Sequence, residues 1–142
     1  MTQFLIKSSQ RDLILFYLMK KNIKIASLRK SRREWQEELD PLLRQACFTR
    51  DQGKCVRCGR PPLAPHHLYR KGRYTRLRYD LDNVLSLCFY HHQEAHLNGL
   101  EFANWFNEKY PARAKYLRLR SQVNDKSKPD WNAIKLYLVS FI

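Results

Sequence analysis

CVRCGRPPLAPHH, residues 55–67, and CFYHHQEAH, residues 88–96, decide how this chain folds. The protein has five His and four Cys, and only Cys47 lies outside these two stretches. Histidine and cysteine are the side chains that most often bind transition metals. Their concentration predicts two metal sites, one that stabilises a small fold and one that takes part in chemistry.

The first expected site combines Cys55-x2-Cys58 with Cys88-x2-His91. Two ligands three residues apart on a tight turn can share one tetrahedral ion, so this set predicts a structural Zn²⁺ site. Zinc binding in finger-like sites is worth about 10–16 kcal/mol, which would stabilise so small a core. The alternatives are a chance CxxC or a redox pair, and no thioredoxin-like strand–helix context supports the latter. Cys47 is interpreted as a small buried hydrophobe.

The second expected site starts from the doublet His66-His67 in a predicted strand. Neighbours on a strand point to opposite sides, so the two imidazoles can have different roles. His92 and His96 are four residues apart on a predicted helix and therefore share a face. With His66 they could bind one divalent metal that keeps open positions for water and phosphate. His67 would then be free as a general base, with a reference pKa near ~6.5.

The order His66-His67, Asn83, His92, His96 resembles the HNH, or ββα-metal, nucleases. The nuclease colicins share the His-His doublet and the terminal His-x3-His. The short zinc-containing HNH proteins common in bacteriophages share the paired knuckles and the sequence style around Asp82-Asn83. The resemblance covers residues 46–107.

This resemblance implies an α+β fold with a small ββα-metal core and a zinc knuckle at 46–107. The two ends lie outside the resemblance: residues 1–45 are expected to form a mainly helical basic extension, and residues 108–142 a helical extension. It implies that His67 activates the attacking water and that Asn83 holds the His67 loop through hydrogen bonds. Three histidines would bind Mg²⁺, Mn²⁺, Ni²⁺ or Zn²⁺ next to the phosphate and the leaving O3′, giving 5′-phosphate and 3′-hydroxyl products. These ligands are His66, His92 and His96.

Two points stay open in the sequence. Many zinc-type HNH proteins have cysteine where this chain has His91, and the adjacent His92 makes the assignment depend on register; the x2 spacing from Cys88 favours His91. Each candidate also has a plainer interpretation, such as a turn residue for Asn83 or a surface histidine on a helix. That all of these plainer interpretations hold at once, for residues that occur in this order, is the less economical explanation.

The charge of the chain predicts an anionic partner. Lys and Arg number 27 against 13 Asp and Glu, a net charge of +14. Nucleic acid is the leading candidate, DNA first and RNA not excluded, ahead of a membrane surface or the ribosome. Between His67 and Asn83 the sequence places basic and aromatic side chains that could contact phosphates. They are Arg70, Lys71, Arg73, Tyr74, Arg76 and Arg78.

The remaining segments predict location and packing. The apolar run Leu13–Met19 is too short to span a bilayer, and no signal peptide is evident, so a reducing cytoplasm is expected, that of the host if the protein is phage-encoded. Helices are expected at 27–50 (split or kinked at Pro41), 89–97 (closed by Asn98-Gly99), 100–110, 112–122 and 131–142, and strands at 64–69 and 83–88. The apolar ends 11–19 and 131–142 would pack on the core or bind a phage or host protein.

The sequence thus predicts a metal-dependent DNA endonuclease of the HNH class that nicks or cuts duplex DNA. One active site per chain predicts nicking by a monomer. One alternative is a catalytically silent, zinc-folded DNA-binding or partner-dependent accessory protein. Others are an RNA-directed or ribosome-binding factor and a regulator acting through another protein. Replacing His67 separates an enzyme from a scaffold.

Overall fold

The computed structural model describes residues 29–124 and 126–142, and the chain divides into two compact units, Met1–Trp35 and Gln36–Ile142. The apolar segment 11–19 lies outside the described residues. In the first unit, the described residues lead into helix α2 (Arg32–Arg50). The Glu34 carboxylate accepts from the Ser31 N–H at 2.6 Å, and the Ser31 hydroxyl accepts from the Glu34 N–H at 3.3 Å. This capping box fixes the helix start, later than the predicted residue 27.

The second unit contains most of α2, which continues as one helix through the exposed Pro41, so of the expected split or kink there the split does not occur. Its apolar stripe has the spacing of one helix face. Leu39, Leu43, Ala46 and Cys47 are buried along this stripe. The C-terminal half of α2 therefore covers the rest of the unit with a continuous apolar surface.

The sheet consists of two antiparallel strands, β1 (Ala64–His67) and β2 (Val84–Leu87). His66 pairs with Leu85, and His67 pairs with Val84. Both strands are shorter than predicted, and Asn83 belongs to a 3-10 turn, η3 (Leu81–Asn83), rather than to β2. A second turn, η2 (Thr75–Leu77), lies in the long connection between the strands.

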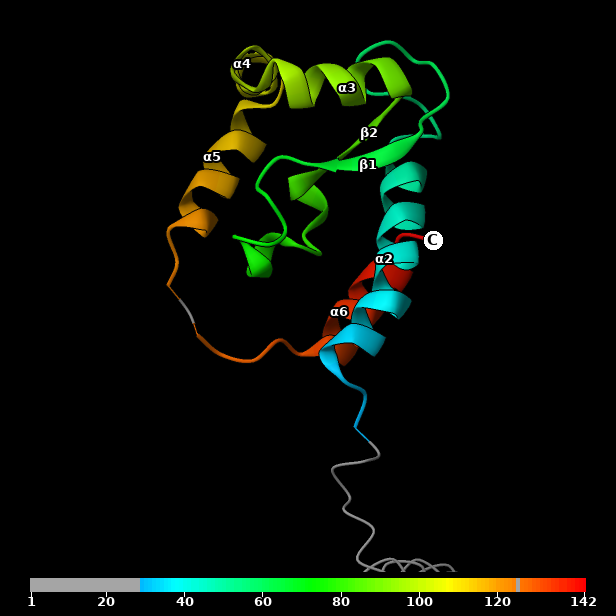
Figure 1. Cartoon of the computed structure of the whole chain (residues 1–142), viewed down its shortest axis with the longest axis vertical. Helices are drawn as coiled ribbons and strands as arrows, with labels where there is room; N and C mark the ends of the chain where they lie inside the picture. Colours follow the sequence, from blue (N-terminus) through cyan, green and yellow to red (C-terminus); the bar gives the residue numbers. More distant parts are fainter. Residues whose placement is uncertain (1–28, 125) are drawn as a thin grey trace, which may run out of the picture. The chain divides into compact units, whose positions relative to one another are not determined.

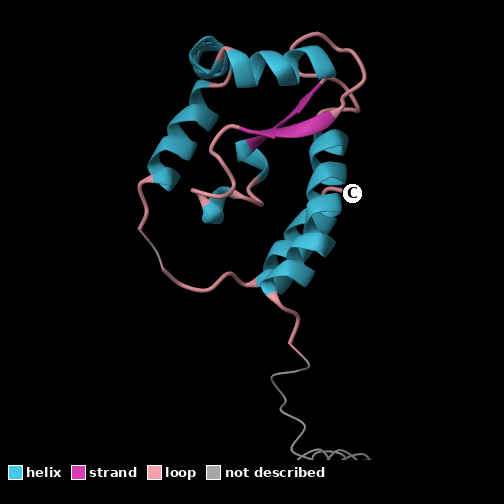
Figure 2. Ribbon diagram, viewed as in Figure 1, coloured by secondary structure: helices cyan, strands magenta, loops and turns pink. Residues whose placement is uncertain are grey.

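Strand β2 is buried on both faces, which explains why its sequence, VLSL, lacks a clear polar side. Ser86 faces α2: its hydroxyl donates to the Cys47 carbonyl at 3.3 Å. Leu85 and Leu87 face the opposite way, into a core cluster that includes Phe102. Figures 1 and 2 show the strands between α2 and the helices that follow them.

Four helices complete the unit: α3 (Phe89–Leu97), α4 (Gly99–Lys109), α5 (Pro111–Ser121) and α6 (Trp131–Val139). Helix α3 has the predicted bounds, but Gly99 begins α4 instead of closing α3. Pro111 begins α5, a position that suits its missing N–H. Helix α6 lies beside α2 (Figure 1), where Lys135 pairs with Glu38. The predicted α+β class is confirmed in this coarse sense.

The second unit, Gln36–Ile142, includes parts of both predicted extensions. Helix α2 crosses the predicted boundary at residue 45/46, and Leu117 of α5 is fully buried in the same cluster as Phe106. No helix within the described residues is long and apolar enough to cross a membrane. The apolar C-terminal end is partly open to solvent, with Leu136 73% and Ile142 49% exposed.

Candidate metal centres

The first centre is built from a tight turn that follows α2. The Gly59 N–H donates to the Cys55 carbonyl at 2.8 Å, and the Cys55 N–H donates to the Arg60 carbonyl at 2.7 Å. Gly59 has φ +74°, a left-handed conformation that glycine adopts without strain. The Val56 N–H donates to the Ser86 carbonyl at 3.0 Å and fixes this turn to β2. The turn is therefore held close to Cys88, which follows that strand.

The atoms of Cys55, Cys58, Cys88 and His91 converge on one point and form a possible metal-binding site. The His91 Nδ1 lies 3.5 Å from the Cys55 Sγ and 3.4 Å from the Cys88 Sγ. The Cys58 and Cys88 sulfurs are 3.7 Å apart. In a tetrahedral site with metal–sulfur bonds of 2.3 Å and metal–nitrogen bonds of 2.0–2.1 Å, a nitrogen and a sulfur ligand would be about 3.6 Å apart. Two sulfur ligands would be about 3.8 Å apart. The donor set therefore fits a tetrahedral ion.

The two cysteines of the turn differ in acidity. Burial disfavours the Cys55 thiolate, but backbone amides and His91 outweigh it and lower the pKa of Cys55 to about 6. The Arg60 amide favours the Cys58 thiolate, yet the neighbouring sulfurs outweigh it and raise the pKa of Cys58. Adjacent thiols repel each other's negative charge, and a cation between them would remove this conflict.

Glu94, one turn after His91, supports this centre from outside. Its Oε2 lies 3.9 Å from the His91 Nε2, and it pairs with Arg57 at 2.6 Å. The Arg57 guanidinium lies over the Trp105 ring, 4.9 Å from its centroid. Since His91 faces the sulfurs through Nδ1, its other nitrogen is directed to a carboxylate, an arrangement that orients metal-binding histidines.

The second possible metal site joins His66 of β1 with His92 and His96 of α3, whose ligand atoms all lie within 4.8 Å of one another. The ring centroids of His66 are 5.4 Å from His92 and 5.0 Å from His96. Burial first, and then the neighbouring imidazoles, lower the pKa of His66 to about 4. Burial and His96 also lower the pKa of His92. Neutral imidazoles have the free lone pairs that a divalent metal needs.

His67 is oriented by a backbone carbonyl. Its Nε2 lies 2.9 Å from the Arg78 oxygen, and because that oxygen can only accept, Nε2 carries the proton and Nδ1 carries the lone pair. Burial, and then the charges of Lys71 and Arg78, lower the pKa of His67. The side chain is therefore a neutral imidazole with one nitrogen free to accept a proton.

Asn83 connects the two ends of the loop between the strands. It is fully buried, its Oδ1 accepts from the Tyr69 N–H at 2.7 Å, and its Nδ2 donates to the carbonyls of Tyr69 at 3.0 Å and Leu77 at 2.9 Å. All hydrogen-bonding groups of the amide except one lone pair are thus used. Asn83 holds the segment that follows His67.

Two arginines that no sequence motif marks hold the backbone around Asn83. Arg50 of α2 donates to the carbonyl of Val84 at 2.7 Å and to that of Leu81. Arg113 of α5 donates to the Asp82 carbonyl at 2.8 Å. Both lie more than 30 residues along the chain from the carbonyls that they bind, so no local motif reveals them.

The basic residues of the loop fall into two groups. Arg78 is bound by the Asp40 carboxylate at 2.7 and 3.1 Å, with the Tyr79 hydroxyl donating to the same carboxylate. By contrast, Arg70, Lys71 and Arg73 are exposed. Arg78 therefore fixes the carbonyl that His67 contacts, and the exposed group faces solvent.

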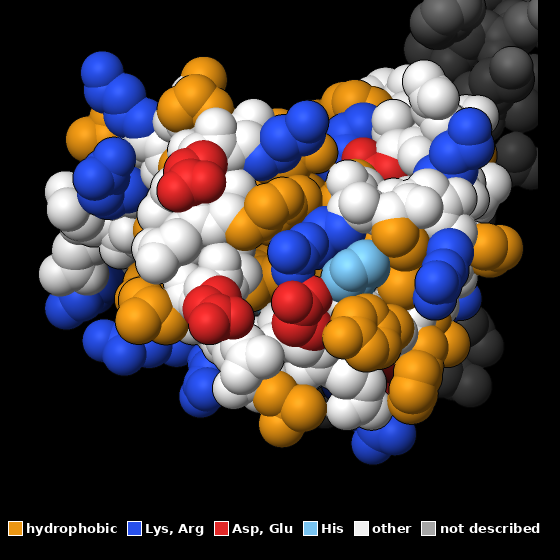
Figure 3. Space-filling model, turned by 90° about the horizontal axis from the view of Figure 1, so that it is seen from above, with side chains coloured by type: hydrophobic (Ala, Val, Ile, Leu, Met, Phe, Trp, Pro, Cys, Tyr) orange, Lys and Arg blue, Asp and Glu red, His pale blue; other side chains and the backbone are white. Residues whose placement is uncertain are grey.

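A separate basic hollow of about 430 Å³ lies between this loop and the end of α5. Arg73, Arg76 and Arg120 line it with Tyr74 and several hydroxyl and amide side chains, and no acidic residue lines it. Arg76 also donates to the Ser127 hydroxyl at 2.7 Å. On the face drawn in Figure 3, basic side chains are spread widely, with hydrophobic ones between them.

No protein-family model, curated protein or solved structure matches the chain. The possible roles of its residues therefore rest on the geometry described above.

Proposed function

We propose that this protein is a metal-dependent nuclease of the HNH (ββα-metal) class that nicks duplex DNA. The observation that carries the proposal is the different placement of two neighbouring histidines. His66 belongs to the three-histidine cluster, whereas His67 is oriented by a carbonyl with its Nδ1 left to accept a proton. A general base beside a divalent ion is the pair of groups that hydrolyses a phosphodiester.

The cysteine-rich centre is proposed to bind structural Zn²⁺. Three thiolates and one imidazole at tetrahedral spacing are the donors and geometry that zinc prefers. The ion would join the turn after α2, the end of β2 and the start of α3. These segments surround the sheet, so the centre would hold the chemical site in place.

In the proposed reaction, His67 accepts a proton from the water that attacks phosphorus. Asn83 and the Arg78 carbonyl keep this imidazole in position. His66, His92 and His96 would hold Mg²⁺, Mn²⁺, Ni²⁺ or Zn²⁺, which when bound stabilises negative charge on the phosphate and on the leaving O3′. The products are a 5′-phosphate and a 3′-hydroxyl.

Exposed basic side chains would bind the DNA backbone. Arg70, Lys71 and Arg73 follow His67 along the chain, and the hollow lined by Arg73, Arg76 and Arg120 offers a second place for a phosphate. Arginine contacts phosphate with two parallel hydrogen bonds. Such contacts do not read sequence, so weak sequence preference is expected. Arg78 is proposed to act through its carbonyl instead.

Relaxation of supercoiled plasmid tests the proposal. Native protein should convert it to open circles with Mg²⁺, Mn²⁺ or Ni²⁺ and not with EDTA, and His67→Ala should slow nicking by about 10²–10⁴-fold. Gln93→Ala, an exposed change on α3 between the two centres, is the matched control and should nick normally. End-labelling should find 5′-phosphate at the nick.

Plasmid binding without nicking under every metal would overturn the proposal. It would favour the catalytically silent DNA-binding protein, whose binding surface does not require His67. Faster cleavage of structured RNA than of duplex DNA would instead identify RNA as the substrate, since net charge alone does not distinguish the two.

A further inference from the structure

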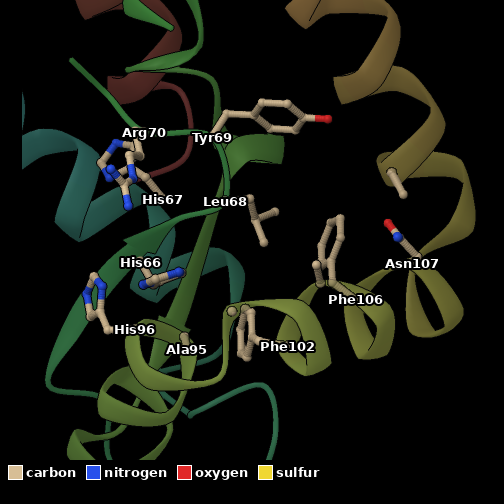
Figure 4. Close-up of a pocket in the computed structure, with 13 residues that line it drawn as sticks. His66, His67, Leu68, Tyr69, Arg70, Ala95, His96, Phe102, Phe106 and Asn107 are labelled. Carbon is tan, nitrogen blue, oxygen red and sulfur yellow. The ribbon is translucent and has the colours of Figure 1, made fainter. Parts of the chain in front are cut away.

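A hollow of about 390 Å³ opens beside the three-histidine cluster, between the end of β1 and helix α4. His66, His67 and His96 form one side (Figure 4). Its volume is in the lower part of the range of about 300–1,000 Å³ in which proteins bind small molecules. The proposed phosphate chemistry uses only the histidine side and leaves the rest of the hollow unexplained.

The floor of the hollow is apolar. Phe102 and Phe106 are each 3% exposed, and Leu68 projects between them and the histidines (Figure 4). Ala103 and Ala114 also line it, and their small side chains leave the space open. A phosphate or a sugar hydroxyl gains nothing from such a floor, whereas a flat, weakly polar ring does.

The rim is polar and partly rigid. Both backbone groups of Tyr69 are bound by Asn83, and its ring packs edge-on against Tyr74 with centroids 5.0 Å apart. The Tyr69 side chain therefore has a fixed position at the rim of the hollow. On another side lies Asn107, an exposed residue of α4 whose amide makes no hydrogen bond to any other described residue. An amide offers a donor and an acceptor, as the edge of a nucleobase requires.

Charge also selects the occupant. No acidic residue lines the hollow, and Arg70 lies at its edge. A ligand bearing a phosphate can therefore enter without repulsion and bring an attached ring over the apolar floor.

We propose that this hollow binds one unstacked nucleobase of the nucleotide next to the cleaved phosphate. The inference rests on the proposed function, because the three-histidine cluster places that phosphate. A paired base cannot reach the floor, so the base must leave the helix. This costs least where the nucleotide is already unpaired. The favoured substrate is thus DNA with a bulge, flap or mismatch, and intact duplex is cut more slowly.

Three DNAs of one sequence test the inference: an intact duplex, a duplex with a single-nucleotide bulge, and the same bulge with an abasic nucleotide. The abasic bulge is equally flexible but has no base to bind. Native protein should cut and bind the bulged DNA about tenfold better than the abasic one, the gain expected for one stacked base. Cleavage is followed by end-labelling and binding by fluorescence anisotropy.

Two variants localise the effect. Ala103→Leu fills the hollow from an exposed helical position that is not a proposed metal ligand, and should reduce the preference for the base to less than about threefold. Ala133→Leu, an exposed change on α6 outside the hollow, should keep it. Ala133→Leu should also nick intact plasmid at the native rate, because it lies outside the hollow and outside both histidine positions of the proposed reaction.

Equal affinity for the bulged and abasic DNAs, or a preference that survives in Ala103→Leu, would overturn the inference. Anisotropy decides this separately from cleavage. If no DNA is cut, the proposed nuclease function fails, and the affinities still report whether a base is bound. If cleavage occurs without any preference for the base, the nuclease function stands and the base-binding hollow does not.

Discussion

The two candidate metal centres differ in the chemistry of their ligands, and the difference indicates how each would work. The first has three thiols, of which the pKa values of Cys55 and Cys58 move in opposite directions. A cation bound between the sulfurs would remove the conflict between their charges. The second has three imidazoles, of which burial lowers the pKa of His66 and His92, and it opens onto a hollow. A site of thiols enclosed by a turn suits a structural ion, and a site of imidazoles with open access suits exchangeable ions and substrate.

The largest expected effect is the loss of the fold on breaking the first centre. Cys88→Ser should abolish metal retention and cooperative thermal unfolding, because zinc binding in such sites contributes about 10–16 kcal/mol to folding. Metal analysis and calorimetry measure this. Cys47→Ser, a change of a buried cysteine outside the site, should keep the ion. A fully folded Cys88→Ser protein would remove the distinction between the centres.

Breaking the second centre should stop chemistry and leave folding unchanged. His96 is exposed, so His96→Ala should lower nicking by about 100-fold or more while the melting temperature shifts little. Plasmid nicking and thermal unfolding, measured on the same sample, distinguish a loss of catalysis from a loss of folding. A collapse of the melting temperature would mean that this centre is structural as well.

Acid should weaken the second centre through His66. Its folded-state pKa of about 4 is below the ordinary 6.5, so the unfolded chain binds more protons between these values. The part of the free energy of unfolding that is linked to His66 is therefore fully present above about pH 6.5. It is lost as the pH falls toward 4, by on the order of 2–3 kcal/mol. Denaturant unfolding with the second centre free of metal measures this, and His66→Gln should flatten the slope. The same slope in the variant would assign the effect elsewhere.

A smaller effect is expected at the support of His91. Glu94→Gln should weaken metal binding at the first centre by about tenfold, since it removes the carboxylate facing the Nε2 and the partner of Arg57. Competition with a chromophoric chelator gives the affinity. Glu108→Gln, an exposed change on α4, serves as the control. Equal affinity in both variants would show that Glu94 does not act on the ion.

The smallest effect concerns the exposed arginines, which serve neither centre directly. Arg73→Gln should weaken DNA binding similarly for all sequences and reduce the salt dependence of affinity by about one phosphate contact. Arg78→Gln should change that slope little, because the Arg78 side chain is 13% exposed and bound to the Asp40 carboxylate, so it would not contact phosphate. A slope unchanged in Arg73→Gln would place the DNA elsewhere.

Local sequence patterns predicted much of the secondary structure and the membership of the centres. Helix α3 has the predicted bounds because its end coincides with a break before Gly99. The x2 spacing grouped Cys88 with His91, and the structure brings both into one possible metal-binding site, since both lie within one turn of the start of α3. The start of α2 was missed because Ser31 and Glu34 form a capping box that the basic residues around it obscured.

Long-range partners could not be predicted, because residues far apart in the sequence form no regular spacing pattern. The pairing of Arg78 with Asp40, the carbonyls bound by Arg50 and Arg113, and the hollow above Phe106 all join segments distant in sequence. Charge alone suggested that Arg78 would contact DNA, yet its side chain is 13% exposed and bound to a carboxylate.

By itself, the sequence determined which side chains can bind metal and that they divide into a cysteine-rich set and a histidine set, because ligand spacing is a local property of turns and helices. The tertiary structure decided where each set converges, since only the pairing of β1 with β2 brings His66 to α3. It also decided which nitrogen of His67 is free, because that depends on a carbonyl eleven residues away. Local chemistry is written in the chain, but its orientation comes from contacts that form only on folding.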